Sequence, residues 1–246
     1  MLSSVGWAAL GVGFIFLMTS LGAASVLFCR EDTLPRSQTG MMGFAGGVMT
    51  AATVWSMLLP AIEQTRSEGT LPCWLPAAAG TAAGAAFLCA LDALILRLRR
   101  GGSAEKSSML MTAITLHNIP EGMAVGLAFA LSGGLTAAAA LALGIGVQNV
   151  PEGAAVSLPL RRMGMSRGRA FSMGVLSGAV EPLFGMLAVM AVSGISRIMP
   201  WLLGFSAGAM LYVVVCELIP AADDRRGLFW YIAGFLLMMI LDVALG

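Results

Sequence analysis

The chain has 246 residues, of which 58% are apolar and only 11% are charged. A soluble domain carries about a quarter charged residues, so this composition excludes a soluble protein and indicates an integral membrane protein. The 14 basic and 13 acidic residues leave a net charge of +1, which does not suggest a nucleic-acid partner.

Apolar stretches recur along the whole chain, and each is close to the roughly 20 residues that a helix needs to cross a bilayer. In chain order the predicted spans are 5–28, 41–63, 72–97, 109–131, 134–158, 170–194, 200–220 and 227–245. The connections are short, so we expect residues 1–246 to form a single transmembrane domain in the lipid bilayer. The predicted fold is all-α, with eight transmembrane helices.

Basic residues gather in alternate loops. Arg66 and Arg197 are the exceptions, and the other 12 of the 14 lie in or beside the loops after spans one, three, five and seven. Because basic loops stay in the cytoplasm, both termini are expected on the extracytoplasmic side of the cell (cytoplasmic) membrane. No basic residue precedes Arg30, so the first stretch reads as a true span and not as a signal peptide.

A six-residue pattern occurs twice inside the predicted spans. The fourth span contains His-Asn-Ile-Pro-Glu-Gly at 117–122, and the fifth contains Gln-Asn-Val-Pro-Glu-Gly at 148–153. Both copies place a carboxylate and an amide in the middle of an apolar helix, where polar groups are expensive and usually functional. The duplication indicates two halves of one site.

Helical spacing groups the polar side chains of the two copies, because residues three and four apart share a face. If the two spans pack antiparallel, one cluster holds His117, Glu121, Gln148 and Glu152. A neighbouring cluster then holds Asn118, Glu121, Asn149 and Glu152. Both carboxylates belong to both clusters, and Glu181, near the centre of the sixth span, is expected to join them.

Each copy also contains a proline, which lacks an N–H and disturbs the preceding turn. Pro120 and Pro151 deprive the carbonyls of Leu116 and Val147 of their helical donors. Irregular backbone beside carboxylates at mid-span is expected, and such backbone suits an ion site. An imidazole with carboxylate and amide oxygens favours a divalent transition metal, although a proton pathway would also use buried carboxylates.

The second and seventh spans resemble each other. Gly43-Phe44, Gly47 and Met49 recur as Gly204-Phe205, Gly208 and Met210, and Leu-Leu-Pro-Ala at 58–61 recurs as Leu-Ile-Pro-Ala at 218–221 after a one-residue gap. The two spans run in opposite directions, so spans 1–3 and 6–8 are predicted to be inverted repeats around the central pair 4–5. Inverted repeats with a midplane site are typical of secondary transporters. Polar contacts with neighbouring helices are expected for Asp92 and Asp242.

The span number and the doubled motif resemble the ZIP (Zrt/Irt-like) family of divalent-metal transporters, in its bacterial form. The resemblance implies transport of zinc into the cytosol, with cadmium, iron and manganese as further substrates, and it implies a dimer. It also implies two metals, one held by His117, Glu121, Gln148 and Glu152 and the other by Asn118, Glu121, Asn149, Glu152 and Glu181. A bundle of spans 1, 4, 5 and 6 would slide against spans 2, 3, 7 and 8.

The resemblance assigns roles on the second span as well. Met49 would contribute to the first metal site, although periodicity alone favours core packing for it and for Ser56. Ser56 would lie near the pathway and Glu63 at its outer mouth. Many members have His at the position of Gln148, and others have Asp at that of Asn149, so one ion or two remains open. No resident cofactor and no catalytic residue is expected.

Three other functions compete with transport of a metal. An intramembrane di-metal carboxylate enzyme would use Glu-x-x-His helices, and a zinc protease would use His-Glu-x-x-His. Both need more than the single histidine of this chain. A proton-coupled carrier of an organic solute would need basic residues inside the membrane to meet an anionic substrate.

Overall fold

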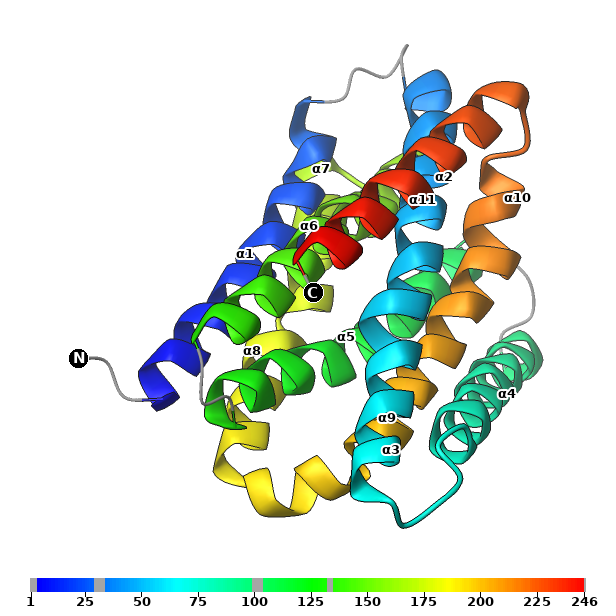
Figure 1. Cartoon of the computed structure of the whole chain (residues 1–246). Coiled ribbons are helices and arrows are strands. Elements are labelled where there is room, and N and C mark those ends of the chain that lie inside the picture. Colours follow the sequence, from blue (N-terminus) through cyan, green and yellow to red (C-terminus); the bar gives the residue numbers. More distant parts are fainter. Residues whose placement is uncertain (1–3, 29–33, 99–103, 132–134, 246) are drawn as a thin grey trace.

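The computed structural model describes residues 4–28, 34–98, 104–131 and 135–245, and the described residues contain helices but no strand. Within these helices some side chains, including that of His117, lie outside the described set. The helices in chain order are α1 (Ser4–Phe28), α2 (Leu34–Ala52), η1 (Thr53–Leu58), α3 (Leu59–Glu68), α4 (Leu75–Leu98), α5 (Ala104–Leu131), α6 (Leu135–Arg162), α7 (Arg167–Gly178), α8 (Val180–Met190), α9 (Val192–Val213), η2 (Val214–Leu218), α10 (Ile219–Ala221) and α11 (Arg225–Leu245). They form one elongated bundle (Figure 1).

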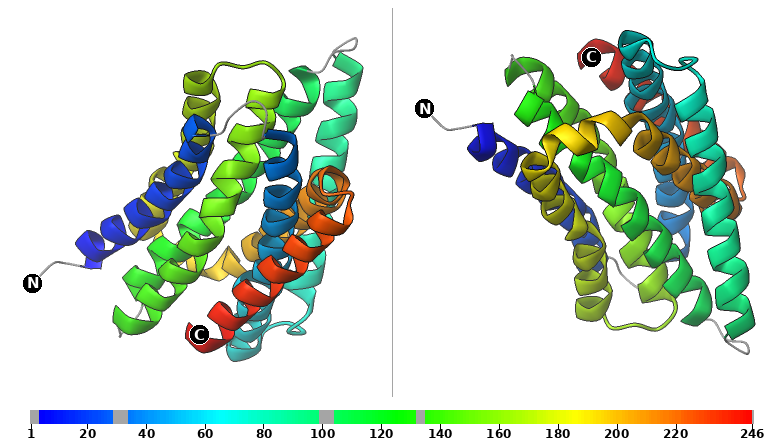
Figure 2. Two further views of the ribbon diagram at one scale, coloured as in Figure 1. Left: turned by 90° about the horizontal axis from the view of Figure 1, so that it is seen from above. Right: turned by 90° about the horizontal axis from the view of Figure 1, so that it is seen from below.

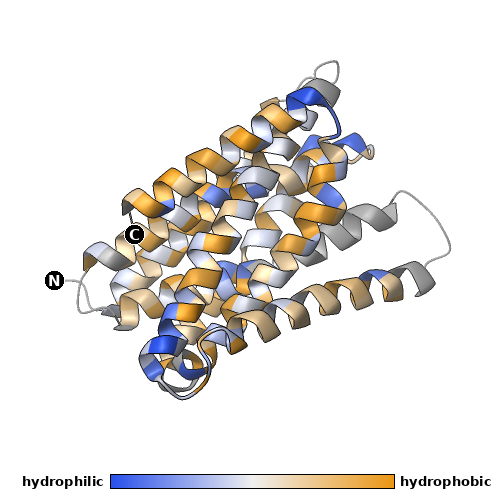
Figure 3. Ribbon diagram, turned by 45° about the vertical axis from the view of Figure 1, so that its right-hand side comes forward, coloured by the Kyte–Doolittle hydropathy of each residue, from blue (hydrophilic) through white to orange (hydrophobic). Residues whose placement is uncertain are grey.

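Six helical segments in the described part of the chain are long and apolar enough to cross a membrane. They are 4–28, 39–68, 75–94, 167–190, 197–221 and 225–244. Helices α5 and α6 have 28 residues each, enough to span, but they carry the polar motifs and are not among the six. Hydrophilic residues gather at the ends of the bundle, and a few lie in its middle (Figure 3).

One predicted loop is helical. A connection was expected at 195–199, between the sixth and seventh spans, yet α9 already begins at Val192. The helix is instead interrupted at Ala191, whose φ of −111° and ψ of 30° leave the helical region. The prediction placed the loop around Arg197, but a charged residue in the first turns of a helix can face outward without ending it, and Arg197 is exposed.

Helix ends elsewhere follow local sequence signals. The α3 helix ends where Gly69 takes a left-handed φ of 68°, which costs glycine little. Ser166 caps α7 by accepting a hydrogen bond from the backbone N–H of Arg169 at 3.4 Å. Asp224 caps α11 in the same way, with its Oδ1 2.5 Å from the backbone nitrogen of Gly227.

The helices that carry the doubled motif continue through its prolines. Pro120 lies inside α5 and Pro151 inside α6, and both helices continue through them. A single missing N–H removes only one hydrogen bond, and the packing of neighbouring helices maintains the rest. The irregular backbone lies in other helices, and the two π-helical segments are the main examples.

Both π-helical segments occur directly before a leucine- or isoleucine-proline pair. At the end of η1 the N–H of Leu59 bonds to the carbonyl of Val54, and at the end of η2 the N–H of Ile219 bonds to that of Val214. In each case the donor precedes a proline, Pro60 or Pro220, that cannot donate itself. The first segment has six residues and the second has five, so the one-residue gap between the similar sequences falls inside them.

The closest helix contacts divide the molecule into two groups. In the first bundle (α1 and α5–α8), α1 packs on α6 and α5 on α8; in the second (α2–α4, η1, η2 and α9–α11), α2 packs on α11 and α4 on α9. Seen from above, α1 and α6 lie on one side and α2 and α11 on the other (Figure 2, left).

Glycines make these contacts possible. A Cβ atom on Gly22 would lie 1.9 Å from the carbonyl oxygen of Val150, and one on Gly47 would lie 1.9 Å from that of Tyr231. Among the described glycines, every approach of this kind closer than 2.4 Å to a carbonyl oxygen joins parts of the same bundle. Close backbone packing of this type holds membrane helices together. It is therefore concentrated within the two bundles and not between them.

Polar contacts add to this packing inside the second bundle, as expected for the two aspartates. The Tyr212 hydroxyl donates to Asp92 Oδ2 at 3.1 Å, and the Ser56 hydroxyl donates to Asp242 Oδ1 at 3.0 Å. Each of these bonds joins two helices and reduces the cost of a carboxyl group inside the membrane.

Candidate metal centre

The polar residues of the doubled motif lie in the interior of the molecule. The following side chains are fully buried, with 0% exposure: Asn118, Glu121, Gln148, Asn149, Glu152 and Glu181. They come from α5, α6 and α8, which all belong to the first bundle. Burial of three carboxyl groups costs free energy unless each has a partner, so their hydrogen bonds indicate what the site can hold.

A short hydrogen bond between side chains joins the two motif helices. The Gln148 Nε2 atom on α6 donates a hydrogen bond of 2.6 Å to Glu121 Oε1 on α5. This is the juxtaposition that the helical spacing predicted for the first cluster. A carboxylate and an amide oxygen from two helices thus lie side by side.

The Glu181 carboxylate on α8 lies close to side chains from three other helices. Its Oε1 accepts a hydrogen bond from Asn118 Nδ2 of α5 at 3.2 Å and another from Thr19 Oγ1 of α1 at 2.8 Å. Asn149 of α6 also lies within hydrogen-bonding reach of it. Glu181 therefore joins the second predicted cluster, as the sequence indicated.

Asn118 connects the acidic residues of this cluster. It lies within hydrogen-bonding reach of Glu152 as well as of Glu181, and its Nδ2 also contacts the backbone carbonyl of Ser177 at 3.2 Å. The carboxylates of Glu152 and Glu181 are near enough for their charges to repel each other. Such a pair is stabilised by a cation between or beside its members.

Thr19 is the residue that sequence reasoning missed. It lies fully buried in the first apolar span and bonds both to Glu181 and to the carbonyl of Ile15, at 2.8 and 3.2 Å. Nothing in its local sequence repeats the motif. Its signal is only that it is one of few hydroxyl groups in a stretch that is otherwise apolar.

The glycine that ends each motif copy explains how these helices come so close. A Cβ on Gly122 would lie 2.3 Å from the carbonyl oxygen of Glu181, and a Cβ on Gly153 would lie 2.0 Å from that of Thr19. Each motif glycine thus packs against the backbone of a residue whose side chain enters the centre. In each Pro-Glu-Gly sequence the glutamate supplies a carboxylate, and the glycine after it leaves room for a neighbouring helix, α8 or α1, to pack closely.

Buried acceptor oxygens without a donor are concentrated in this centre. Among the described residues, no hydrogen-bond donor reaches Asn118 Oδ1, Gln148 Oε1, Asn149 Oδ1 or Glu181 Oε2. Unpaired buried polar atoms are rare and need an explanation. All four are electron-pair donors, carried by three helices, and a metal cation satisfies such atoms where another hydrogen-bond acceptor would not.

The remaining predicted ligands are less directly placed. His117 falls within α5, but its side chain is outside the described residues. Met49 is fully buried in the hydrophobic core that α2 shares with α6, α9 and α11. This agrees with the core packing that periodicity favoured, and its role as a ligand stays a prediction.

Two residues expected along the pathway, Ser56 and Glu63, line a common cavity with Asp242. Ser56, Glu63 and Asp242 border a cavity of about 370 Å³ whose opposite wall is formed by Ala140, Leu141 and Gly144 of α6. The cavity therefore lies between the two bundles. The carboxyl groups of Glu63 and Asp242, which are 179 residues apart in the sequence, both line this cavity.

In the part of the chain that the structure describes, no group of three or more His, Cys, Asp and Glu side chains is close enough to hold a metal ion. The carboxylates of the centre are interleaved with the amides of Asn118, Gln148 and Asn149.

Comparison with known proteins identifies relatives over nearly the whole chain. A family model described as ZIP zinc transporter matches residues 99–242. Zinc transporter ZIP11 of Homo sapiens is 35% identical, over 99% of this chain and 98% of the human protein. Zinc transporter GufA of Myxococcus xanthus is 38% identical over 93% and 94% of the two chains. Zinc transporter ZIPB of Bordetella bronchiseptica is 38% identical over 98% and 82%.

Proposed function

This chain belongs to the ZIP family of zinc transporters, and from that membership we propose that it moves zinc into the cytosol through the centre between α5, α6 and α8. The observation that carries the proposal is the set of unpaired acceptor oxygens on Asn118, Gln148, Asn149 and Glu181. Carboxylate, amide and imidazole ligands suit zinc and similar divalent metals.

The proposed ligands are those that the sequence indicated: His117, Asn118, Glu121, Gln148, Asn149, Glu152, Glu181 and Met49. The two predicted ligand clusters have Glu121 and Glu152 in common, so the proposed centre holds either one ion or two. Cadmium, iron and manganese are further proposed substrates, since oxygen and imidazole ligands discriminate weakly among divalent metals. The metal is cargo in this proposal, and no resident cofactor is needed.

The alternative of an intramembrane di-metal enzyme has no support among the relatives. The family and its members are named as zinc transporters, not as enzymes. We therefore retain transport alone.

The direct experiment is zinc uptake by purified protein in sealed liposomes that contain a zinc-sensitive dye. Glu152→Gln is expected to lower the flux by at least about tenfold, the effect that loss of a metal-site group produces. Glu68→Gln makes the same chemical change on an exposed helix end and is expected to retain full flux. Zinc uptake that Glu152→Gln leaves unchanged, in a variant that unfolds like the parent, would contradict the proposed centre.

We further propose that α5 and α6 also cross the membrane, which gives eight spans, a single transporter domain over 1–246 and extracytoplasmic termini in the cell membrane. The alternation of basic loops supports this topology. The decisive position is Thr136, which is exposed at the start of α6. With the native cysteines replaced, Thr136→Cys should react with a membrane-impermeant maleimide added outside intact cells. Protection from the outside, with labelling only after lysis, would exclude spanning by this pair.

An inverted repeat and a sliding mechanism complete the proposal. The matched π-helical segments before Pro60 and Pro220 support the repeat of spans 1–3 in spans 6–8, with 4 and 5 as the central pair. The two bundles have the composition that the family mechanism implies, with spans 1, 4, 5 and 6 in one and 2, 3, 7 and 8 in the other. A homodimer is proposed on family grounds, and light scattering in detergent tests it.

A further inference from the structure

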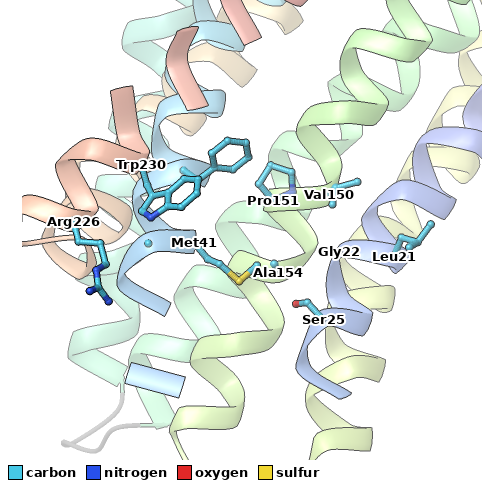
Figure 4. A pocket seen from close by; sticks show the side chains of 11 residues that line it. Leu21, Gly22, Ser25, Met41, Val150, Pro151, Ala154, Arg226 and Trp230 are labelled. Carbon is cyan, nitrogen blue, oxygen red and sulfur yellow. The ribbon is translucent and has the colours of Figure 1, made fainter. Parts of the chain in front are cut away.

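A large crevice lies between the two bundles, beside Val150 and Pro151 of the second motif copy. It has a volume of about 770 Å³, within the range of roughly 300–1,000 Å³ that is typical of ligand sites. Leu21 of α1 and Val150 of α6 line one side, and Met41 of α2 and Trp230 of α11 line the other (Figure 4). Its walls are almost entirely apolar side chains. The helices that carry them are either apolar enough to cross a membrane or packed against such helices.

One charged group borders this crevice. Arg226 is exposed, lies next to the start of α11 and has no hydrogen bond or ion pair among the described residues. Asp224, the nearest acidic residue that could neutralise it along the chain, caps the helix through the N–H of Gly227. The guanidinium group is therefore available to an external anion.

A polar group inside the crevice is also unsatisfied. The Ser25 hydroxyl, which lines it from α1, is buried and has no hydrogen-bond partner among the described residues. Figure 4 shows Ser25 across the crevice from Arg226 and Trp230. The crevice thus offers an apolar wall for a chain, a hydroxyl for an ester or glycerol oxygen, and a cation at the rim for a phosphate.

The aromatic wall is firmly held. Trp230 packs against Gly40 so closely that a Cβ there would lie 3.0 Å from its Cδ1 atom, and its ring meets that of Phe44 edge to face at 6.3 Å. A fixed indole at the end of a membrane helix is typical of the interface between acyl chains and headgroups.

We propose that this crevice binds an anionic phospholipid of the leaflet that contains the basic loops, with its acyl chain between the bundles and its phosphate on Arg226. Basic pockets between membrane helices bind such headgroups. A lipid of this kind lies against helices of both bundles and contacts Pro151 and Ala154 of α6.

The test uses quenching of Trp230 fluorescence by brominated lipids in nanodiscs, with Trp230→Phe protein subtracted to isolate this indole. At equal mole fraction, brominated phosphatidylglycerol is expected to quench Trp230 several-fold more than brominated phosphatidylcholine. Arg226→Gln should lower the preference by roughly fivefold. Arg225→Gln removes the same charge one residue away, outside the crevice, and should leave the preference intact.

Three outcomes would overturn the proposal. Equal quenching by both lipids would mean that the crevice accepts any acyl chain. An equal loss of preference in Arg225→Gln and Arg226→Gln would indicate general surface electrostatics. Absence of quenching by either lipid would mean that another protein surface covers the crevice. Zinc uptake by the same nanodisc-purified protein after transfer to liposomes is measured separately and does not depend on these results.

Discussion

Gln148 Nε2 and Glu121 Oε1 lie 2.6 Å apart and join the two motif helices at the centre of the molecule. The amide N–H group of Gln148 faces a carboxylate, and its own oxygen has no donor among the described residues. The side chain thus compensates the buried carboxylate while presenting an acceptor to a cation. A metal that binds both residues has to replace this hydrogen bond.

Replacement of Gln148 by histidine is expected to strengthen zinc binding by about tenfold, the scale of single changes around a metal site. A neutral imidazole nitrogen is a better zinc ligand than an amide oxygen. The substitution also removes the hydrogen bond from the Gln148 amide to Glu121, which leaves this carboxylate free to coordinate the metal. Isothermal titration of the purified variant measures the affinity. An affinity equal to that of the parent would mean that residue 148 does not touch the metal.

Removal of the Thr19 hydroxyl is expected to weaken zinc binding by about tenfold, because partners that orient metal ligands contribute on this scale. Thr19→Val keeps the shape of the side chain but not its donation to Glu181 at 2.8 Å. Thr19→Ser keeps the donor and should retain the parent affinity. If the valine and serine variants bind zinc equally well, the hydroxyl does not position Glu181.

The motif glycines can be tested by adding one methyl group. Gly153→Ala would place a Cβ 2.0 Å from the carbonyl oxygen of Thr19, which is backbone and cannot rotate away. We expect the free energy of unfolding to fall by about 1–3 kcal/mol, with loss of zinc uptake as α1 and α6 separate. Thermal unfolding in detergent measures the first effect.

Gly13→Ala is the control for that change. A Cβ at Gly13 has no neighbour within 4 Å, although the residue lies in the same helix as Thr19. Alanine inside a helix stabilises it by about 0.5–1 kcal/mol relative to glycine. An equal loss of stability in both variants would refute the role of close packing at the motif.

The sliding mechanism predicts that a link between the bundles stops transport. The position of a Cβ on Gly144 of α6 is 3.3 Å from Asp242 Oδ1 of α11, so paired cysteines at 144 and 242 face each other across the boundary. A short thiol cross-linker should abolish zinc flux in this double variant, and reversal of the link should restore it.

A pair within one bundle serves as the control for the cross-link. Cysteines in place of Ser56 and Asp242 join η1 to α11 inside the second bundle, where the native side chains are 3.0 Å apart. This link should leave the flux at the level of the unlinked double variant. Continued flux in the cross-linked 144–242 protein would exclude relative motion of the bundles.

Metal binding should also appear as thermal stabilisation. A ligand that binds only the folded protein contributes about 2.7 kcal/mol at 100 times its Kd, so zinc and cadmium should raise the unfolding temperature and a chelator should reverse the shift. Magnesium demands nearly regular octahedral oxygen coordination and should have little effect. The Glu152→Gln variant is expected to lose the zinc shift, and a shift of the same size in it would place the metal elsewhere.

The amino-acid sequence alone determined the helical class and predicted the main residues of the proposed centre. The 3.6-residue period defines which side chains share a helix face, so two copies of one motif were enough to predict the approach of Gln148 and Glu121. A buried carboxylate is also visible in sequence wherever it stands in an apolar stretch, as Glu181 does.

The tertiary structure decided what lies between helices. The role of Thr19, the division into two bundles and the lipid-sized crevice all depend on which helices pack together, and helix periodicity does not contain that information. The backbone around the prolines also required it: α5 and α6 remain helical through Pro120 and Pro151, whereas π-helical turns form before Pro60 and Pro220. A proline removes the same hydrogen bond in each case, and the surrounding packing determines how the helix accommodates the loss.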